Sequence, residues 1–285
     1  MHVVTQRSRD MMIQMMKHLM LISIFISTGT LSAFAQTSSS QLPNSSSSFS
    51  QAELESSLEE IESLLTQGAF LKAKAYYQIL IEQDLPAKDK QVIQNTLEKL
   101  NMKILFSPIE TPDSFFYTVQ AGDSLSKLAK KHHTTVDLIK KSNQLSTDLI
   151  RTDVKLKITK AIYSIVVDVS ENKLKLFSDG ELLRTYPMAS GKEGHPTPRG
   201  SFTIVTKLEN PVWYKTGAVF PPGSPDNILG TRWLGFSLKS YGIHGTTLPE
   251  TIGTNASEGC LRMYNRDVEE LYTVVPLGTA VSIVS

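Results

Sequence analysis

The chain of 285 residues contains one cysteine, and the residues around it determine whether its thiol could be reactive. Cys260 lies in the stretch NASEGCLRMYN, residues 255–265. A thiol with a pKa of about 8.5 is only a few per cent thiolate at neutral pH, so a catalytic cysteine needs a neighbouring base. The alternative is a buried cysteine that acts as a small apolar side chain.

The best candidate for that base is His244, sixteen residues before the cysteine in the stretch YGIHGTT. It ends an apolar, strand-like run, and the turn-rich segment TLPETIGTNAS that follows can bring the two strand ends together. His195 instead precedes a proline in a loop and has no such return path. We therefore predict Cys260 as the nucleophile and His244 as the proton donor and acceptor.

Three further residues of this stretch could support the reaction. Gly259 has no side chain, so a substrate carbonyl could approach the backbone beside the sulfur. Backbone N–H groups near Gly259 and Cys260, together with the Ser257 hydroxyl, could stabilise an oxyanion. In an extended segment Arg262 lies on the same face as Cys260, where it could lower the pKa of the thiol or hold a substrate carboxylate. A salt bridge to an acidic side chain is the structural alternative for this arginine.

Metal and serine chemistry receive little support from the sequence. His195, His244 and Cys260 would need a fourth zinc ligand, and none appears at a helical or C-x-x-C spacing. A serine nucleophile would require a G-x-S-x-G element, which the chain lacks. We expect no metal and no cofactor.

The N-terminal region indicates export. Basic residues precede an apolar run, and small residues follow at the positions that a signal peptidase reads: Arg7, Arg9 and Lys17, then 19–31, then Ala33 and Ala35. We predict a cleaved signal peptide over 1–35, with an uncleaved membrane anchor as the alternative, and a location in the periplasm or at the cell wall. A serine-rich flexible linker, 36–50, follows. Lysine plus arginine number 29 and aspartate plus glutamate 28, so no basic field for nucleic acid is expected.

Residues 51–106 form a predicted small all-α segment. Apolar residues recur at helical spacing from residue 51 to Gly68, over 70–81 and over 87–105. The corner at Gly68 faintly resembles a tetratricopeptide hairpin, but a solenoid needs about three such units. We therefore predict a helical spacer that could dock a protein partner.

The next segment, 116–159, is predicted to fold as strand, helix, helix, strand. Its motif YTVQAGDSLSKLAKKHHTTVDLIKKSNQL resembles a LysM domain. This chain departs from the family pattern in having Thr152-Asp153 where a glycine is usual before the last strand. The resemblance implies binding of glycans that contain N-acetylglucosamine, such as peptidoglycan. It places the groove between two loops, with Gly122, Asp123, Ser124, Leu149 and Ile150 as the contact residues.

Residues 162–285 are predicted to form a mainly β domain with one helix after Asn265, which we expect to cap that helix. The stretches HGT and SEGCLRM, with ASGKEGHPTPRGSF at 189–202, resemble the catalytic domain of L,D-transpeptidases of the YkuD type. The resemblance implies a β-sandwich-like fold, Cys260 as nucleophile, His244 as acid and base, and oxyanion surroundings from Gly259 and Ser257. Many family members carry a histidine where this chain has Glu258, to which we assign no role.

The combination predicts a multidomain, exported enzyme of peptidoglycan. The resemblance implies that a cysteine thioester with a stem tetrapeptide would be transferred to an amine of another stem, which gives a 3→3 crosslink, and that carbapenem β-lactams would be inhibitors. The alternatives are an L,D-carboxypeptidase, in which water takes the acyl group, and a non-catalytic protein that only binds or anchors to peptidoglycan.

Overall fold

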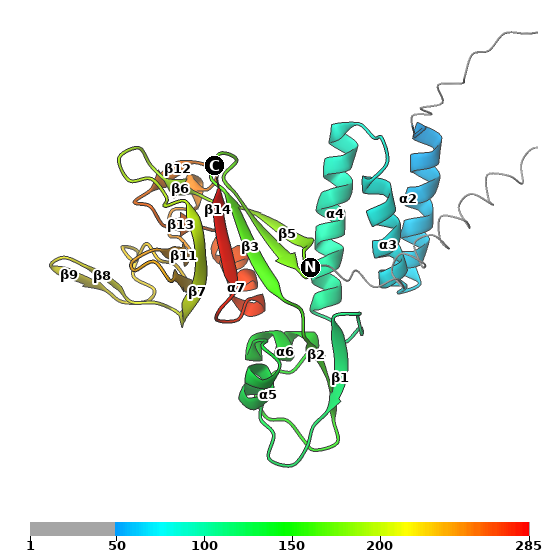
Figure 1. Cartoon of the computed structure of the whole chain (residues 1–285), viewed down its shortest axis with the longest axis horizontal. Coiled ribbons are helices and arrows are strands. Elements are labelled where there is room, and N and C mark those ends of the chain that lie inside the picture. The colour runs from blue at the N-terminus through cyan, green and yellow to red at the C-terminus, as the bar shows by residue number, and fades with distance from the viewer. Residues whose placement is uncertain (1–48, 285) are drawn as a thin grey trace, which may run out of the picture. The chain divides into compact units, whose positions relative to one another are not determined.

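The computed structural model describes residues 49–284 (Figure 1). The predicted signal peptide and all of the predicted linker except its last two residues lie outside the described residues. The described elements belong to one unit of the chain, residues 47–285.

Three helices form the first part of this unit: α2 (Gln51–Thr66), α3 (Phe70–Ile81) and α4 (Ala87–Leu105). Helix α2 begins with a capping box, in which the Ser50 hydroxyl accepts from Glu53 N–H and the Glu53 carboxylate accepts from Ser50 N–H. The predicted ends of the second and third helices are confirmed. The three helices share an apolar core that includes Ile61, Ala73 and Leu97.

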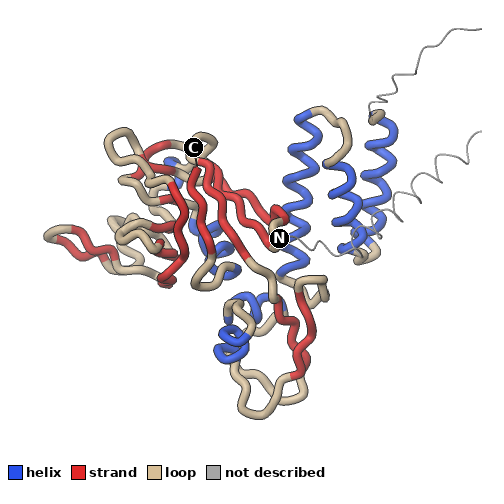
Figure 2. Tube along the Cα trace, viewed as in Figure 1, coloured by secondary structure: helices blue, strands red, loops and turns tan. Residues whose placement is uncertain are grey.

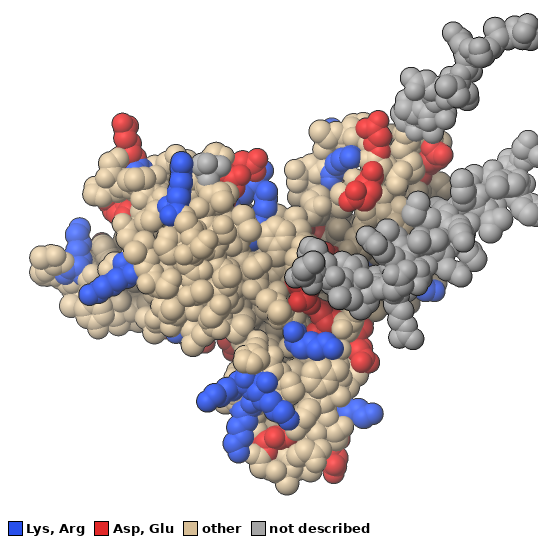
Figure 3. Space-filling model, in the orientation of Figure 1, with Lys and Arg blue, Asp and Glu red and all other residues tan. Residues whose placement is uncertain are grey.

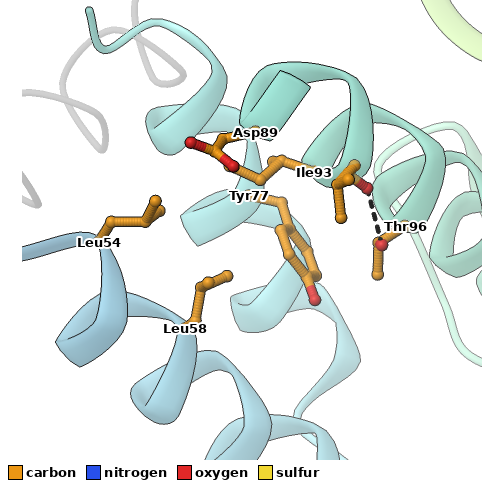
Figure 4. A pocket seen from close by; sticks show the side chains of 7 residues that line it. Leu54, Leu58, Tyr77, Asp89, Ile93 and Thr96 are labelled. Carbon is orange, nitrogen blue, oxygen red and sulfur yellow. Dashed lines mark hydrogen bonds between the residues drawn. The ribbon is translucent and has the colours of Figure 1, made fainter. Parts of the chain in front are cut away.

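A shallow apolar pocket lies on the surface of this helical module (Figure 4). Side chains of α2 and α4 form its walls, and Tyr77 of α3 points between them. Its lining residues are Leu54, Leu58, Tyr77, Asp89, Val92, Ile93 and Thr96. A protein partner for the helical module stays a prediction.

The LysM-like segment has the predicted order of elements: β1 (Ser114–Thr118), α5 (Leu125–Lys131), α6 (Val136–Ser142) and β2 (Lys155–Thr159). The two strands pair antiparallel, and Ser124 and Thr135 cap the two helices with their hydroxyl groups. Basic side chains gather over this module in Figure 3. Two of its lysines lie over aromatic rings, Lys131 over Tyr117 and Lys141 over Phe106, so their methylene stems cover apolar surface.

The C-terminal part is built on one eight-stranded sheet, whose strands are red in Figure 2. The sheet has both parallel and antiparallel pairs. Helix α7 (Asn265–Val274) packs against β10 and β11 of that sheet, and together they enclose the largest apolar core. The expected mainly β fold is confirmed, and its main sheet is curled. In spatial order the strands are β13 (Leu261–Arg262), β11 (Gly242–His244), β10 (Arg232–Phe236), β7 (Gly200–Glu209), β14 (Ala280–Val284), β3 (Tyr163–Asp168), β4 (Lys173–Ser178) and β5 (Glu181–Pro187).

Shorter elements complete this part of the chain. A parallel pair joins β6 (Ser190–Gly191) to β12 (Asn255–Ser257), directly before the cysteine. A hairpin pairs β8 (Trp213–Lys215) with β9 (Ala218–Phe220), and a 3₁₀ turn spans Pro249–Thr251. The β6–β12 pair holds one side of the turn that carries Cys260.

Helix α4 covers β5, the last strand of the sheet. The carboxylate of Glu98, only 3% exposed, accepts hydrogen bonds from the Thr185 N–H at 3.0 Å and from the Thr185 hydroxyl at 2.9 Å. The Asn101 amide donates to the Leu182 carbonyl at 3.3 Å. These helix side chains pair with backbone groups of an edge strand that would otherwise face water.

The LysM-like segment is joined to both of its neighbours by polar contacts. The Lys157 ammonium, in strand β2, donates to the carbonyls of Ile104 and Ser107 at the end of α4, each at 3.0 Å. The Thr135 hydroxyl donates to the carbonyl of Thr273 in α7. A buried ammonium is costly unless it is hydrogen-bonded, and these carbonyls supply its acceptors.

Candidate functional site

The base predicted from the sequence lies on strand β11, and the predicted nucleophile directly precedes the neighbouring strand β13. Strands β11 and β13 run parallel, with Ile243 opposite Leu261 and His244 opposite Arg262. Ile243 and Leu261 are fully buried in the core, so their neighbours along each strand point to the opposite face. Cys260, directly before β13, therefore shares that face with His244 and Arg262.

The thiol of Cys260 lies against the beginning of β11. Its sulfur is 3.5 Å from the Ser240 carbonyl oxygen, and the Gly242 N–H points to it. Burial raises the pKa of this thiol, while the Gly242 N–H and the Arg262 guanidinium act in the opposite direction. The resting sulfur is therefore protonated at neutral pH, and a base must remove its proton during attack.

His244 is held in the form that can act as this base. Its ring is 2% exposed and stacks on Trp233 of the adjacent strand, with 5.8 Å between the ring centroids. Nδ1 lies 2.6 Å from the Gly245 carbonyl oxygen, which can only accept, so Nδ1 carries the proton and Nε2 has the free lone pair. Burial lowers the pKa of His244 to about 4, against the opposing effect of that hydrogen bond, so the imidazole is neutral at pH 7.

This pKa predicts an acid-sensitive contribution to stability. The unfolded state takes up a proton at His244 as the pH falls below 6.5, whereas the folded state does so only near pH 4. The free energy of unfolding should therefore fall by about 2–3 kcal/mol between pH 7 and pH 4.5 because of this residue alone. Urea unfolding of the wild type and of His244→Gln at both pH values measures this difference. An equal pH dependence in the two proteins would contradict it.

The turn before the cysteine is closed by its own hydrogen bonds. The Ser257 hydroxyl, 1% exposed, donates to the Cys260 carbonyl at 2.6 Å and accepts from the Gly259 N–H at 3.1 Å. The Ser257 hydroxyl and the Gly259 N–H thus have partners within the turn, and their expected role at an oxyanion stays a prediction. The Cys260 N–H, by contrast, donates to no group within residues 49–284.

Gly259 is required by the shape of this turn. Its φ is +108°, a region that favours glycine, and a Cβ there would lie 2.9 Å from the ring of Tyr241. The same Cβ would lie 3.5 Å from the Pro196 carbonyl oxygen, so the loop after β6 borders the cysteine turn. The Thr197 hydroxyl holds this loop by accepting from the Gly191 N–H at 2.8 Å.

Glu258 pairs with side chains of the same loop. Its carboxylate forms an ion pair with Lys192 at 2.5 Å and lies 3.4 Å from the His195 ring. All three side chains are more than 40% exposed. This exposed pair is worth little to stability, and it holds the two loops together at the edge of the site.

Comparison with known proteins decides the family. Residues 162–283 match the L,D-transpeptidase catalytic domain (YkuD), and residues 117–159 match the LysM domain. A Bacillus licheniformis protein named as the L,D-transpeptidase YkuD is 38% identical over 175 residues, which cover 59% of this chain and 97% of the relative. The chain belongs to the L,D-transpeptidase family. A Bacillus subtilis protein named as the L,D-transpeptidase YqjB is 40% identical over 124 residues, 42% of this chain and 69% of the relative.

Among solved structures, an L,D-transpeptidase of Mycobacterium tuberculosis H37Rv is similar at 18% identity and a TM-score of 0.39, over 47% of this chain and 63% of that chain. The resemblance stated from the sequence is confirmed for both the catalytic domain and the LysM domain. The chain therefore combines an L,D-transpeptidase catalytic domain with a LysM domain. The helical module, 51–106, lies outside both family matches.

One residue that holds the L,D-transpeptidase site was missed by sequence reasoning. Asn265 was expected to cap α7, but Tyr264 occupies the cap position, and its side chain accepts no hydrogen bond from the helix. The Asn265 amide instead exchanges two hydrogen bonds with the backbone of Thr246, at 3.0 and 3.1 Å. A Cβ on Gly245 would lie 2.1 Å from its oxygen. Asn265 thus fixes the backbone whose carbonyl orients His244, a long-range contact that no local pattern reveals.

The first predicted glycan loop of the LysM domain is held by its own polar groups. The Asp123 carboxylate accepts from the Tyr117 hydroxyl at 2.9 Å and from a backbone N–H at 2.8 Å. The Ser124 hydroxyl is engaged in capping α5, and Gly122 has a φ of +86°. These side chains shape the loop, so the groups left for a glycan are mainly those of its backbone.

The second predicted loop begins beside the first. The Val119 carbonyl accepts a hydrogen bond from the Asp153 N–H at 2.9 Å, so the two loops begin side by side at the end of the β1–β2 sheet. Leu149 is 87% exposed, whereas Ile150 packs against the LysM core. Asp153, which stands where the family usually has glycine, adopts a φ of +67°, a region that aspartate tolerates better than most residues.

Within residues 49–284, no helix combines the length and apolar character needed to cross a bilayer.

Proposed function

We propose that this chain is an exported L,D-transpeptidase that uses Cys260 to form a thioester with a peptidoglycan stem tetrapeptide and transfers the acyl group to an amine. The supporting observation is that Cys260 directly precedes β13, the strand that pairs parallel with the β11 strand carrying His244. The free Nε2 of its neutral imidazole matches the need of a protonated thiol.

The reaction takes place in two balanced steps. His244 Nε2 removes the thiol proton as the sulfur attacks the carbonyl of the diamino acid, and it then gives that proton to the amine of the departing D-alanine. The acceptor amine next attacks the thioester and loses a proton to His244, which returns it to the sulfur as the Cys260–acyl bond breaks. The enzyme leaves this cycle unchanged, and a 3→3 crosslink remains.

The negative charge that develops on the substrate carbonyl oxygen needs a hydrogen-bond donor that has no partner within the described part of the protein. The Cys260 N–H meets this requirement, since the Gly259 N–H and the Ser257 hydroxyl bond to each other. A preorganised backbone donor of this kind contributes about 10²–10³-fold to the rate in other acyl-transfer enzymes. Ser257 and Gly259 act by holding Cys260 in the required conformation.

The LysM domain would hold the enzyme on its polymer. Binding of the glycan strand raises the effective concentration of stems at the catalytic domain. The predicted signal peptide, 1–35, would deliver the protein to the periplasm or the cell wall, where that polymer lies.

Mass spectrometry of a defined reaction tests the proposal. Purified protein is incubated with a disaccharide tetrapeptide, and we expect release of D-alanine and a dimer linked 3→3. Tripeptide without any dimer would show that water is the acceptor and would contradict transpeptidation. A LysM loop variant, Leu149→Ser, serves as a control for glycan binding, because a short soluble stem should still react at an unchanged rate.

A further inference from the structure

The indole of Trp233 lies against the ring of the predicted base. Trp233 in β10 is directly opposite His244 in β11, and their ring planes differ by only 21°, with 5.8 Å between the centroids. An aromatic face attracts a cation that lies within about 6 Å of its centre, and the indole does so most strongly. Because the resting imidazole is neutral, this attraction arises only when His244 takes up a proton.

Two glycines make room for the indole in this place. Gly235 follows Trp233 by two positions in β10, and Gly242 is opposite Gly235 in β11. Side chains two residues apart point to the same face of a strand, so a Cβ on Gly235 would stand on the face of the indole. That Cβ would lie 2.7 Å from Trp233 Nε1, and a Cβ on Gly242 would lie 2.9 Å from Cζ2 of the same ring. The indole therefore occupies space that two side chains would otherwise fill.

The imidazolium that forms during attack has little other support. The His244 ring bonds only to the Gly245 carbonyl, and no carboxylate of residues 49–284 bonds to it. The nearest described cation is Arg262, opposite His244 in β13, and its positive charge disfavours a second one. The salt bridge considered for Arg262 from the sequence is not formed by any carboxylate of residues 49–284, since Glu258 pairs with other side chains.

Transfer of the thiol proton to the imidazole is uphill at this site. Burial lowers the pKa of His244 to about 4, with a further contribution from the Arg262 guanidinium, and burial also raises the pKa of the Cys260 thiol. Both effects favour the neutral pair over the charged one. A contact that attracts only the protonated ring lowers the barrier to attack without stabilising the resting enzyme.

We propose that Trp233 is a positioning residue whose indole face stabilises the His244 ring while it carries the thiol proton. This inference rests on the proposed function. The proton moves from the Cys260 sulfur to Nε2 as the sulfur–carbon bond forms, and it then passes to the nitrogen that leaves. The indole itself exchanges no proton. A desolvated contact between a cation and an aromatic face corresponds to about 3–30-fold in rate.

Fluorinated tryptophan tests the aromatic face with little change in the size of the ring. Fluorine withdraws electron density from the face, which weakens its attraction for a cation. The chain contains two tryptophans, so Trp213→Phe leaves Trp233 as the single labelled position. We expect kcat/KM for D-alanine release from a disaccharide tetrapeptide to fall stepwise through mono-, di- and trifluorotryptophan, by about 3–30-fold in total. Equal values across this series would overturn the role of Trp233.

The matched control labels the other tryptophan. Trp213 stacks on Phe220 in the β8–β9 hairpin, with 4.8 Å between the ring centroids. In Trp233→Phe the fluorinated residues enter only at position 213, and kcat/KM should stay constant through the series. A stepwise fall of the same size in this control would attribute the effect to the hairpin or to the label, and it would overturn the proposal as well.

Titration of His244 provides a readout that requires no reaction. The pKa of this residue is measured by NMR of protein with ¹³C-labelled histidine, and its resonance is identified by its absence in His244→Gln. We expect the pKa to fall by about one pH unit from tryptophan to trifluorotryptophan at position 233, because only the protonated ring loses an attraction. A purely structural role of the indole would leave this pKa constant through the series.

The outcomes for the two proposals differ. A wild type that releases no D-alanine from the stem would overturn the proposed function, whereas the titration of His244 would still measure the contact with Trp233. Release of D-alanine with the same pKa of His244 across the fluorinated series would overturn the role of Trp233 and leave the proposed function in place.

Discussion

Cys260→Ala should gain no mass when it is treated with a carbapenem, whereas the wild type should gain the mass of one inhibitor molecule. The substitution removes the single sulfur that can open the β-lactam ring, and the 285 residues contain no second cysteine to replace it. Thioester formation with a stem peptide should be lost to the same extent, because both reactions start with attack by this sulfur. Intact-mass spectrometry after a fixed time of exposure measures the effect.

Two controls accompany this variant: its unfolding temperature, and the variant Cys260→Ser, in which a hydroxyl replaces the thiol. Cys260→Ala should unfold at a temperature close to that of the wild type, since the alanine keeps the Cβ and the backbone bonds of the turn. Cys260→Ser should fold equally well and acylate far more slowly, because a hydroxyl is a weaker nucleophile beside the same base. A carbapenem adduct on the alanine variant would place the nucleophile elsewhere.

His244→Gln should slow acylation by about 10²–10⁴-fold at pH 7. The glutamine amide fills much of the ring volume, but it cannot accept and return a proton, so the thiol would have to ionise unaided. Because burial raises the pKa of the thiol, only a small fraction would be ionised at that pH. Stopped-flow measurement of carbapenem ring opening gives the rate, and its rise with pH should be steeper in the variant.

His195→Gln is the matched control for the base. This histidine is also close to the cysteine turn, but its ring is 59% exposed and contacts Glu258. Its rate of acylation should stay within about 2-fold of the wild type. A large loss in His195→Gln with little loss in His244→Gln would reverse the assignment of the base.

The elements that local patterns determine were predictable from the sequence. The helices over 70–81 and 87–105 follow from apolar spacing and from flanking breakers, and their observed ends agree. The LysM order of strands and helices follows from its turn and capping residues. Cys260 and His244 could be paired because one short, turn-rich return joins two strand-like runs.

The arrangements that depend on distant parts of the chain were not predictable. Asn265 resembles a helix cap in the sequence, and only the folded chain shows its amide at Thr246. The Ser257 hydroxyl could equally face a substrate or its own turn, and the choice depends on a φ of +108° at Gly259. The order of the eight strands also rests on long-range pairing, such as β14 between β7 and β3.

The contact of α4 with β5 has a consequence for any shortened form of the protein. A fragment that starts after the LysM domain would leave the backbone of Thr185 and Leu182 without the partners that Glu98 and Asn101 provide. Exposed strand borders of this kind recruit strands of other molecules and promote self-association. The helical module, though remote from the chemistry in sequence, would then be what keeps the catalytic domain monodisperse.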